Sequence, residues 1–329
     1  MPAPPPDSTP FTSHTAEALL LVTAALETGL LQLLERERTV SELARERGLD
    51  ARAVAICLDA LVELGVVERG RRGLRLTTFG RARFVDRAST TCLGGGLGPW
   101  RAQLRGWLFL DDVLRTGEPL PEDRSREFRA RLYRSLDQKP AARVEALVER
   151  VLARAPGPRS RVLDVGGGSG VLARAFLARG CAVTLLELPE VLRHVRDAFG
   201  LDRLEGLTLV EGDLRERLPE GPFEVILVAD VLHALSPAEA RALVRAAAAV
   251  SARGAVLAIA EALLGRSRGA GLLGVAMLLA TPEGRSYAEE EVGEWAAAAG
   301  FVEPEVVDLD PAVALFTARR ESRTSRGSG

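Results

Sequence analysis

A glycine-rich turn preceded by an acidic residue is the first stretch of this sequence that could do chemistry. Residues 162–180 read VLDVGGGSGVLARAFLARG, so the glycines stand between an apolar run and a pattern of helical period. Read from Gly168, GSGVLA fits the G-x-G-x-x-A variant of the dinucleotide fingerprint, whose backbone amides bind a pyrophosphate. Read from Asp164, the same residues place an acid before G-x-G-x-G, an arrangement for a nucleoside ligand without phosphate, whose amino group the acid can meet. A plain tight turn between a strand and a helix is the remaining alternative.

Further acids and a histidine follow at the ends of later apolar runs. Glu187 comes about twenty residues after the glycines, where a carboxylate can accept both ribose hydroxyls. Asp213 follows the next run, in VEGDL, where it could reach an adenine amino group. Asp230 and His233 stand in VADVLHALSP, and a histidine within hydrogen-bond reach of a hydroxyl can act as a general base. A structural histidine held by hydrogen bonds is the alternative for His233.

Short apolar runs that alternate with helical patterns must position these residues. The runs after Arg161 are RVLDV, VTLLEL, LTLVEGD, FEVILVAD and AVLAIAE. Strands that alternate with helices predict an α/β fold, in which a doubly wound, Rossmann-like parallel sheet holds its ligands at the carboxyl ends of the strands. The acids and the histidine should therefore meet at one edge of that sheet.

The N-terminal part of the chain has a different pattern. Apolar residues recur at helical spacing from Ala16 to Leu34, and residues 39–80 then predict a helix, a turn at Gly48, a second helix and a short basic hairpin. This order is typical of a mostly helical winged-helix domain. The first helix is more apolar than a small domain needs, which suits contact with a second subunit, so we expect a homodimer.

The candidate recognition helix argues against nucleic acid as a partner. Within residues 50–64, Asp50, Asp59 and Glu63 outnumber Arg52, whereas a DNA-reading helix needs cationic or amide side chains. A formal net charge of −2 adds no general attraction to nucleic acid or to an anionic membrane. We therefore expect a domain for oligomerisation or for enclosing a substrate, and a ligand-responsive winged-helix regulator is the alternative outside enzymes.

Length and composition fit a soluble protein of two domains. The 329 residues, 47% of them hydrophobic, can bury a substantial core. The three scattered cysteines lack C-x-x-C spacing, which argues against a zinc site or a disulfide framework, and we expect them to be buried apolar residues. No cluster of His, Asp and Glu indicates a metal site. The N-terminus has no signal segment and no apolar run spans a membrane, so we expect a cytoplasmic protein without a membrane partner.

Four stretches together resemble the motifs of a known enzyme family. LDVGGGSG, ELPEV, GDLR and LHAL correspond to the family stretches LDVGGGTG, DLPEV, GDFF and LHDW. The chain resembles the bacterial and plant small-molecule O-methyltransferases (EC 2.1.1.-), which use S-adenosylmethionine and dimerise through an N-terminal winged helix. The resemblance covers most of the chain. It implies cofactor contacts at Asp164, Gly166, Gly168, Glu187, Leu188, Asp213 and Leu214.

The same resemblance implies catalytic and substrate-binding residues. His233 matches the general base of the family, and Glu261, in AIAEALL, matches the acidic residue that flanks this histidine. Met277 and Leu136 fall where family members line the substrate pocket. The acceptor is expected to be a small molecule, held in line with the methyl group and the sulfur, because orientation is the main requirement of this reaction.

Some positions differ from the family. Ala234 and Leu235 replace an Asp and a Trp after the histidine, and Ala229 or Asp230 replaces a basic residue before it. These differences keep open a carbon- or nitrogen-methylating enzyme, or a non-methylating one, on the same scaffold. The resemblance otherwise predicts O-methylation of a small aromatic or polyketide-like natural product in bacterial secondary metabolism.

We divide the chain into four parts on these patterns. Residues 1–99 are predicted to form the winged-helix dimerisation domain, and residues 100–157 a mostly helical linker and substrate cap. Residues 158–320 are predicted to form the S-adenosylmethionine-binding methyltransferase domain. Residues 321–329 are polar, small and without periodicity, which predicts a disordered tail.

Overall fold

The computed structural model describes residues 15–86, 89, 92, 93, 106–120, 139–157 and 159–321. The chain divides into two compact units, Met1–Leu104 and Arg105–Gly329. The predicted divisions after residues 99, 157 and 320 stay predictions, and residues 322–329 of the predicted tail lie outside the described residues.

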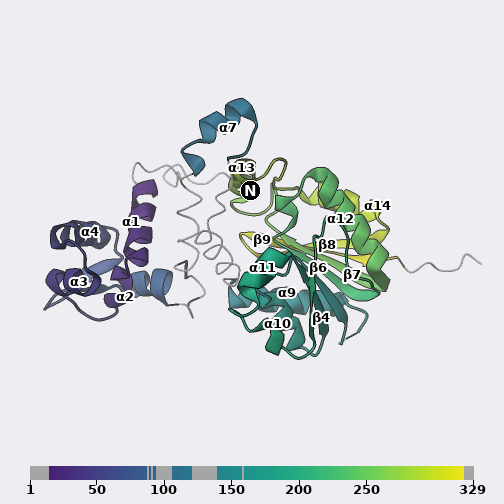
Figure 1. The fold of residues 1–329 in the computed structure, drawn as a ribbon, viewed down its shortest axis with the longest axis horizontal. Coiled ribbons are helices and arrows are strands. Elements are labelled where there is room, and N and C mark those ends of the chain that lie inside the picture. Colours follow the sequence, from purple (N-terminus) through teal and green to yellow (C-terminus); the bar gives the residue numbers. More distant parts are fainter. Residues whose placement is uncertain are drawn as a thin grey trace, which may run out of the picture. The chain divides into compact units, whose positions relative to one another are not determined.

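The first unit is mostly helical and includes one hairpin (Figure 1). Its helices are α1 (Thr15–Glu27), α2 (Leu30–Leu33), α3 (Val40–Arg47), α4 (Ala51–Glu63), α5 (Thr78–Gly80) and the π-helical turn η1 (Arg81–Val85). The helical pattern predicted from Ala16 to Leu34 is divided between α1 and α2, because Gly29 has a left-handed φ of 76°. Glycine adopts this conformation without the steric clash of a Cβ, and it ends helices for that reason.

Capping residues fix where α3 and α4 begin. Thr39 and Glu42 form a capping box: the Glu42 N–H donates to Thr39 Oγ1 at 3.3 Å, and the Thr39 N–H donates to the Glu42 carboxylate at 2.8 Å. Asp50 accepts the N–H of Ala53 at 2.8 Å at the start of α4. The antiparallel hairpin strands are β1 (Val67–Arg69) and β2 (Leu74–Leu76). The predicted helix, turn, helix and hairpin are thus present in the predicted order.

A seven-stranded sheet forms the core of the second unit (Figure 1). Its strands are β3 (Arg161–Val165), β4 (Ala182–Glu187), β5 (Leu207–Glu211), β6 (Phe223–Ala229), β7 (Ser251–Glu261), β8 (Phe301–Asp310) and β9 (Val313–Arg320). The strand order is β5-β4-β3-β6-β7-β9-β8, and neighbours from β5 to β7 pair in parallel. The five predicted strands and the doubly wound α/β fold are confirmed.

The pair β8 and β9 was not predicted, and it makes the sheet mixed. β9 pairs antiparallel with both β7 and β8. β8 contains Pro304 and a register shift between Val302 and Glu305, and it lies at the edge of the sheet. Proline cannot donate to a ladder and is tolerated at edges and bulges, so the sequence of β8 does not have the pattern of a central strand.

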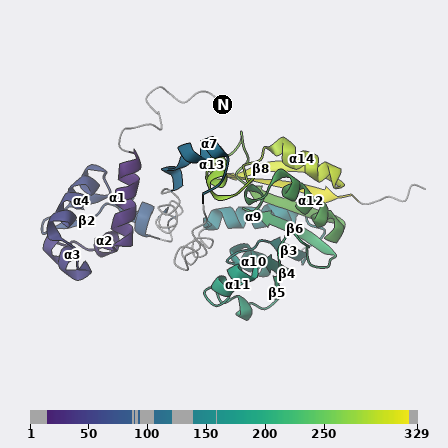
Figure 2. The ribbon, with the colours of Figure 1, turned by 45° about the horizontal axis from the view of Figure 1, so that its top comes forward.

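Helices cover both faces of this sheet (Figures 1 and 2). In the described part of this unit the helices are α7 (Leu110–Thr116), α9 (Ala141–Arg154), α10 (Val171–Leu177), α11 (Pro189–Val195), η2 (Leu201–Arg203), η3 (Leu232–Ala234), α12 (Pro237–Val250), α13 (Ala270–Ala280) and α14 (Glu289–Ala298). On one face α12 and α14 share an apolar core with Leu163 and Ile226. On the other face α9, α10 and α11 pack with Val162 and Val225. Successive strand residues point to opposite faces, which separates the two cores.

The strand order reverses between β3 and β6. The chain runs outward from β3 through β4 and β5, and then continues at β6 on the other side of β3. A doubly wound sheet binds its ligands outside the carboxyl ends of the strands at such a switch point. Here that edge carries Asp164, Glu187, Asp230 and Glu261.

Membrane spans and metal clusters are both absent from the described parts of the chain. No helix there is long and apolar enough to cross a membrane. No group of His, Cys, Asp and Glu side chains among those residues could hold a metal ion. The three cysteines form no disulfide: Cys181 is buried as predicted, whereas Cys57 and Cys92 are partly exposed, which corrects the prediction for these two.

Candidate active site

A cavity of about 830 Å³ lies at the switch point of the sheet. Its walls come from the glycine-rich turn after β3, the segments after β4, β5 and β6, and the end of α13. The residues with a predicted cofactor contact all line it, namely Asp164, Gly166, Gly168, Glu187, Leu188, Asp213 and Leu214. The fold therefore brings together residues from three separate motifs, and their contact with the cofactor stays a prediction.

The glycines of the turn keep the cavity open close to the backbone. Gly166 has a left-handed φ of 68°, and a Cβ there would lie 2.8 Å from Cγ2 of Val231. A Cβ on Gly167 would lie 2.6 Å from Cγ of Leu185 and 2.7 Å from Oδ2 of Asp164. Any side chain at Gly167 would thus fill the space beside the Asp164 carboxylate.

Asp164 is a buried carboxylate with an oxygen that has no partner. The residue is 1% exposed, and its Oδ2 has no hydrogen bond. Burial raises the pKa of Asp164 to about 7; the Lys139 ammonium acts to lower this pKa and the Glu187 carboxylate to raise it. A cation bound at Oδ2 would stabilise the ionised form. Asp164 is therefore suited to a ligand with a positively charged group.

Two other acids of the cavity already accept hydrogen bonds from the protein. Glu187 accepts the N–H groups of Gly168 at 3.0 Å and Leu188 at 2.7 Å. Burial raises the pKa of Glu187, although both hydrogen bonds act against this. Asp213 accepts Nε of Arg215 at 3.0 Å on each oxygen, and this pairing holds the pKa of Asp213 below its usual range despite some burial. The two carboxylates are thereby fixed in orientation.

Glu261, the last residue of β7, is a buried carboxylate with partners for both oxygens. Its Oε1 accepts the N–H groups of Val231 and Leu232, each at 2.7 Å. Its Oε2 lies 2.9 Å from Nδ1 of His233 and accepts a hydrogen bond when that nitrogen carries the proton. Glu261 thus holds both the turn η3 and the histidine ring, and Nε2 becomes the ring nitrogen that can accept a proton.

Opposing effects act on the pKa of His233. Burial lowers this pKa, whereas the charge and the hydrogen bond of Glu261 raise it; Asp230 also raises it and Lys139 lowers it. The result is a pKa above the ordinary value for histidine. The protonated ring is therefore stabilised by the carboxylate beside it, as a proton acceptor in catalysis requires.

His233 does not line the cavity, although its neighbours do. Val231, Ala234 and Leu235 are lining residues, so η3 forms part of the wall. The hydroxyl of Tyr287 donates to the carbonyl of Leu235 at 2.5 Å and anchors the end of this segment. The histidine is placed beside the cavity wall, with 17% of its side chain exposed.

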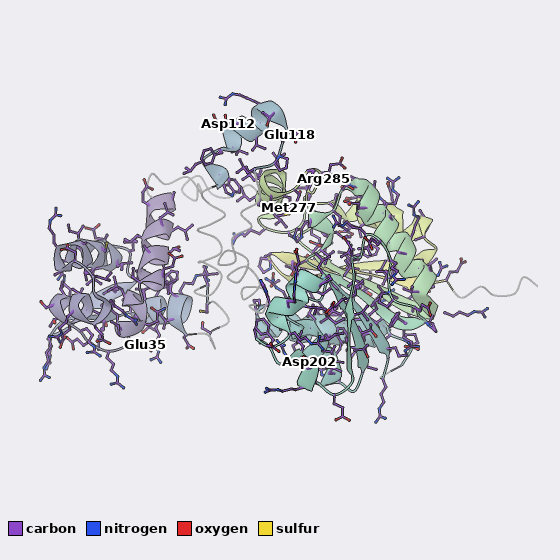
Figure 3. All side chains as sticks on the ribbon, viewed as in Figure 1. Glu35, Asp112, Glu118, Asp202, Met277 and Arg285 are labelled. Carbon is purple, nitrogen blue, oxygen red and sulfur yellow. The ribbon has the colours of Figure 1, made fainter. Side chains whose placement is uncertain are left out.

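Of the two predicted substrate-pocket residues, Met277 is the one that the structure describes. Met277 belongs to α13, where Figure 3 labels it. It is buried and does not line the cavity, although Ala280 at the end of the same helix does. Leu136 lies outside the described residues. Their contact with an acceptor stays a prediction.

Lys139 and Ser169 are lining residues that the sequence did not predict. The Lys139 ammonium forms an ion pair with the Asp230 carboxylate. Lys139 is the single lysine among 43 Lys and Arg residues, and this rarity is a signal that could have singled it out. The buried Oγ of Ser169, within the glycine-rich turn, has no hydrogen-bond partner.

Comparison with known proteins gives consistent results for sequence and structure. Residues 122–302 match the O-methyltransferase domain family. The tetracenomycin polyketide synthesis 8-O-methyl transferase TcmO of Streptomyces glaucescens is 29% identical over 296 residues, which are 85% of this chain and 86% of that protein. Acetylserotonin O-methyltransferase of Mus musculus molossinus is 31% identical over 293 residues, 79% of this chain and 74% of that protein. The crystal structure of human N-acetylserotonin methyltransferase in complex with SAM has the same fold, with a TM-score of 0.83 at 22% identity over 94% of this chain and 96% of that one.

Proposed function

Because the chain belongs to the S-adenosylmethionine-dependent O-methyltransferase family, we propose that it methylates a hydroxyl of a small aromatic or polyketide-like natural product, with His233 as the general base. The observation that carries the proposal is the 2.9 Å contact between Nδ1 of His233 and Oε2 of Glu261 beside the cavity. The acceptor class is supported by the name of one relative, a transferase of tetracenomycin polyketide synthesis.

The cavity fits S-adenosylmethionine by its own features. The unpartnered Oδ2 of Asp164 can accept the ammonium group of the amino-acid end, and the glycine turn leaves room beside it. Glu187 keeps free lone pairs for ribose hydroxyls, because a carboxylate can accept about four hydrogen bonds and Glu187 accepts two here. Asp213 accepts four hydrogen bonds from Arg215, so we propose that the adenine amino group replaces one of these donors when the cofactor binds. When bound, the cofactor supplies an electrophilic methyl group on a sulfonium centre. We propose that it is held by Asp164, Gly166, Gly168, Glu187, Leu188, Asp213 and Leu214.

His233 can take the proton of a neutral hydroxyl acceptor. A phenol has a pKa of about 10 and is mostly protonated near neutral pH, so its proton has to leave as the new bond forms. The neutral Nε2 of His233 takes this proton, and the Glu261 carboxylate stabilises the imidazolium that results. A positioned base of this kind accelerates a reaction roughly 10² to 10⁴-fold.

An acceptor panel tests the reaction type. Polycyclic phenols are offered with S-adenosylmethionine, beside the matching methyl ethers and the matching aromatic amines as controls, and products are identified by mass spectrometry. Phenols should be converted to ethers, whereas the pre-blocked ethers should not react. Transfer to carbon in the blocked ethers, or preferred transfer to the amines, would contradict O-methylation.

Carbon or nitrogen methylation, or a non-methylating reaction with the same cofactor, is the second candidate. One observation favours it: Ala234 and Leu235 line the cavity and His233 does not. In this case His233 is a structural residue, and its removal lowers turnover only as far as it lowers the amount of folded protein. The two candidates therefore differ in how strongly turnover depends on the histidine.

We further propose that the chain is a cytoplasmic homodimer whose first domain, residues 1–99, supplies the interface. Leu20, Ile56 and Phe79 of this domain are 44%, 55% and 56% exposed, which is apolar surface that a second subunit can cover. Residues 100–157 act as linker and substrate cap, and residues 158–320 as the cofactor-binding domain. Light scattering of the full chain should give the mass of a dimer, and a monomer would contradict the proposal.

The charges of the first unit support a partner other than nucleic acid. Arg69 and Arg75 of the hairpin form ion pairs with Asp59 and Glu68, which compete with phosphate for these cations. A winged-helix regulator predicts duplex binding that weakens as salt rises. We expect no binding in a salt titration with random duplex DNA.

A further inference from the structure

Lys139 is a cation that the fold brings to the cavity from a distant part of the chain. It precedes α9, and its Nζ pairs with the carboxylate of Asp230, which follows β6 and is 91 positions away in sequence. Both residues line the cavity together with Asp164. The Lys139 side chain is 21% exposed and that of Asp230 is 41% exposed, so the lysine is the more enclosed partner.

Asp230 has an unusual backbone conformation at this place. Its φ of 57° lies in the left-handed region, which few residues other than glycine adopt, although aspartate does so more readily than most. Its N–H donates to the carbonyl of Ala260 at 3.0 Å, so the conformation is held by the end of the sheet. A strained residue that persists at a cavity points to a role for the side chain it presents.

Among the described residues, Lys139 supplies a positive charge that acts on Asp164. The charged residues lining the cavity in the described parts of the chain are Asp164, Glu187, Glu190, Asp213, Asp230, Lys139 and Arg215. Arg215 follows β5 and is engaged by both oxygens of Asp213. The Lys139 ammonium, in contrast, acts on Asp164. Burial raises the pKa of Asp164, and the charge of Lys139 lowers it by a smaller amount.

The chemistry of the cofactor requires a cation at this position. S-adenosylmethionine carries its ammonium and its carboxylate on one carbon atom, so a ligand whose ammonium meets Asp164 also places a carboxylate nearby. That carboxylate would be repelled by Asp164 and Asp230 unless a cation lay between them. The lysine ammonium has three N–H donors, so it can bind a ligand carboxylate while it keeps its pairing with Asp230.

We propose that Lys139 binds the α-carboxylate of the cofactor and that Asp230 holds the lysine in place for it. This inference rests on the proposed function, because it needs the cofactor bound with its ammonium at Asp164. It assigns a binding role to a residue that lies outside the glycine-rich turn and outside the acids at the strand ends.

Calorimetric titration of the full chain with two probes tests the proposal. S-adenosylhomocysteine has both charged groups, whereas S-(5′-adenosyl)-3-thiopropylamine keeps the amine and lacks the carboxylate. At about pH 8.5, above the pKa of about 7 of Asp164, the protein should bind the first probe about 10- to 100-fold more tightly. Lys139→Gln should remove this preference, because it weakens the binding of the first probe only. Lys139→Arg should keep most of the preference.

Controls separate a specific loss from a general one. Arg150→Gln changes an exposed cation on α9 and should leave both affinities unchanged, and thermal unfolding without ligand should be similar for all variants. Equal affinities of both probes for the unmodified chain, or a Lys139→Gln variant that keeps the preference, would overturn the assignment. Failure of the unmodified chain to bind either probe would instead overturn the proposed function.

A double-mutant cycle tests the part assigned to Asp230. Asp230→Asn keeps a side chain that tolerates the left-handed conformation and removes the charge. It should weaken the binding of S-adenosylhomocysteine when Lys139 is present. In the Lys139→Gln background it should not weaken binding, because there it only removes a negative charge near the ligand carboxylate. Equal effects in both backgrounds would overturn the positioning role of Asp230.

Discussion

Asp164 on β3 and Glu261 on β7 are two buried carboxylates at the same edge of the sheet, and they differ in what they bind. They are 1% and 4% exposed. Glu261 accepts hydrogen bonds on both oxygens, all from the short segment that contains His233. Asp164 lines the cavity and has an oxygen with no partner.

The difference shows how one sheet edge serves two purposes. A buried acceptor without a partner destabilises the folded chain by about 1 to 3 kcal/mol, so an unpartnered oxygen in a cavity points to a ligand that supplies the partner. A buried carboxylate with all its partners in the protein stabilises the fold locally. Changes at Glu261 should therefore affect stability and the histidine, and changes at Asp164 should affect ligand binding.

The largest expected effect is on the histidine that Glu261 holds. His233→Ala should lower turnover roughly 10² to 10⁴-fold and leave the affinity for S-adenosylhomocysteine nearly unchanged, because the base acts on the acceptor. Higher pH should recover part of the loss with a phenolic acceptor, since the phenol then ionises without help. Initial rates and calorimetry measure the two quantities.

His194→Ala is the matched control for that substitution. His194 lies on α11 and does not line the cavity, so its removal should leave turnover within about twofold. If His233→Ala and His194→Ala had similar effects, the histidine beside Glu261 would have no special part in catalysis. Glu261 would then differ from Asp164 only in stabilising the fold, with no part in catalysis through His233.

The next effect is on stability. Glu261→Ala removes the acceptor of two buried N–H groups, those of Val231 and Leu232, and should lower the free energy of unfolding by about 2 to 5 kcal/mol. Asp164→Asn at pH 8 should not lower it, because no hydrogen bond to Oδ2 is lost and a buried charge is removed. Urea unfolding measures the free energy of unfolding of both variants. Equal destabilisation would contradict the different roles given to Glu261 and Asp164.

The pH dependence of Asp164 gives a third, smaller effect. Its pKa rises from 3.8 in the unfolded chain to about 7, so the folded chain binds more protons in this range and the free energy of unfolding falls as pH rises from about 4 to about 7. A ligand ammonium needs the ionised form, so the affinity for S-adenosylhomocysteine should rise up to tenfold per pH unit over that range and level off above about pH 7.

Asp164→Asn tests that assignment. The variant should bind S-adenosylhomocysteine about 10- to 100-fold more weakly at pH 8, and the rise in affinity between pH 5 and 7 should be lost. Isothermal titrations at several pH values provide the measurement. An unchanged pH dependence would mean that another group titrates and that Asp164 does not meet the ammonium.

The smallest expected effect is on the pKa of His233, which the charge of Glu261 raises. Glu261→Gln keeps an oxygen that can accept the N–H groups of Val231 and Leu232 but removes the charge that raises the pKa of His233. The pKa of His233 should therefore fall, while stability changes little. NMR titration of the imidazole measures the shift, and a pKa that stayed the same would show that Glu261 does not control the ring.

Local patterns were enough to predict most of the fold that positions the site. The inner parallel strands β3, β4, β6 and β7 appear as short apolar runs because strands covered on both faces are largely apolar. The edge strand β8 has Pro304 and exposed acids, so its sequence resembles a loop and only pairing with β9 makes it a strand. The break at Gly29 was missed because apolar spacing continues across it and the backbone conformation alone interrupts the helix.

Local sequence features were enough to place the acids, since a glycine-rich turn and the ends of strands put Asp164, Glu187 and Asp213 at one edge of a doubly wound sheet. The partners of Glu261 and of Lys139, in contrast, follow from the tertiary fold. Glu261 meets the segment of His233 about 30 positions earlier, and Lys139 meets Asp230 91 positions later. Such pairings depend on which strand ends become neighbours when the chain folds, and no periodicity along the chain contains that information.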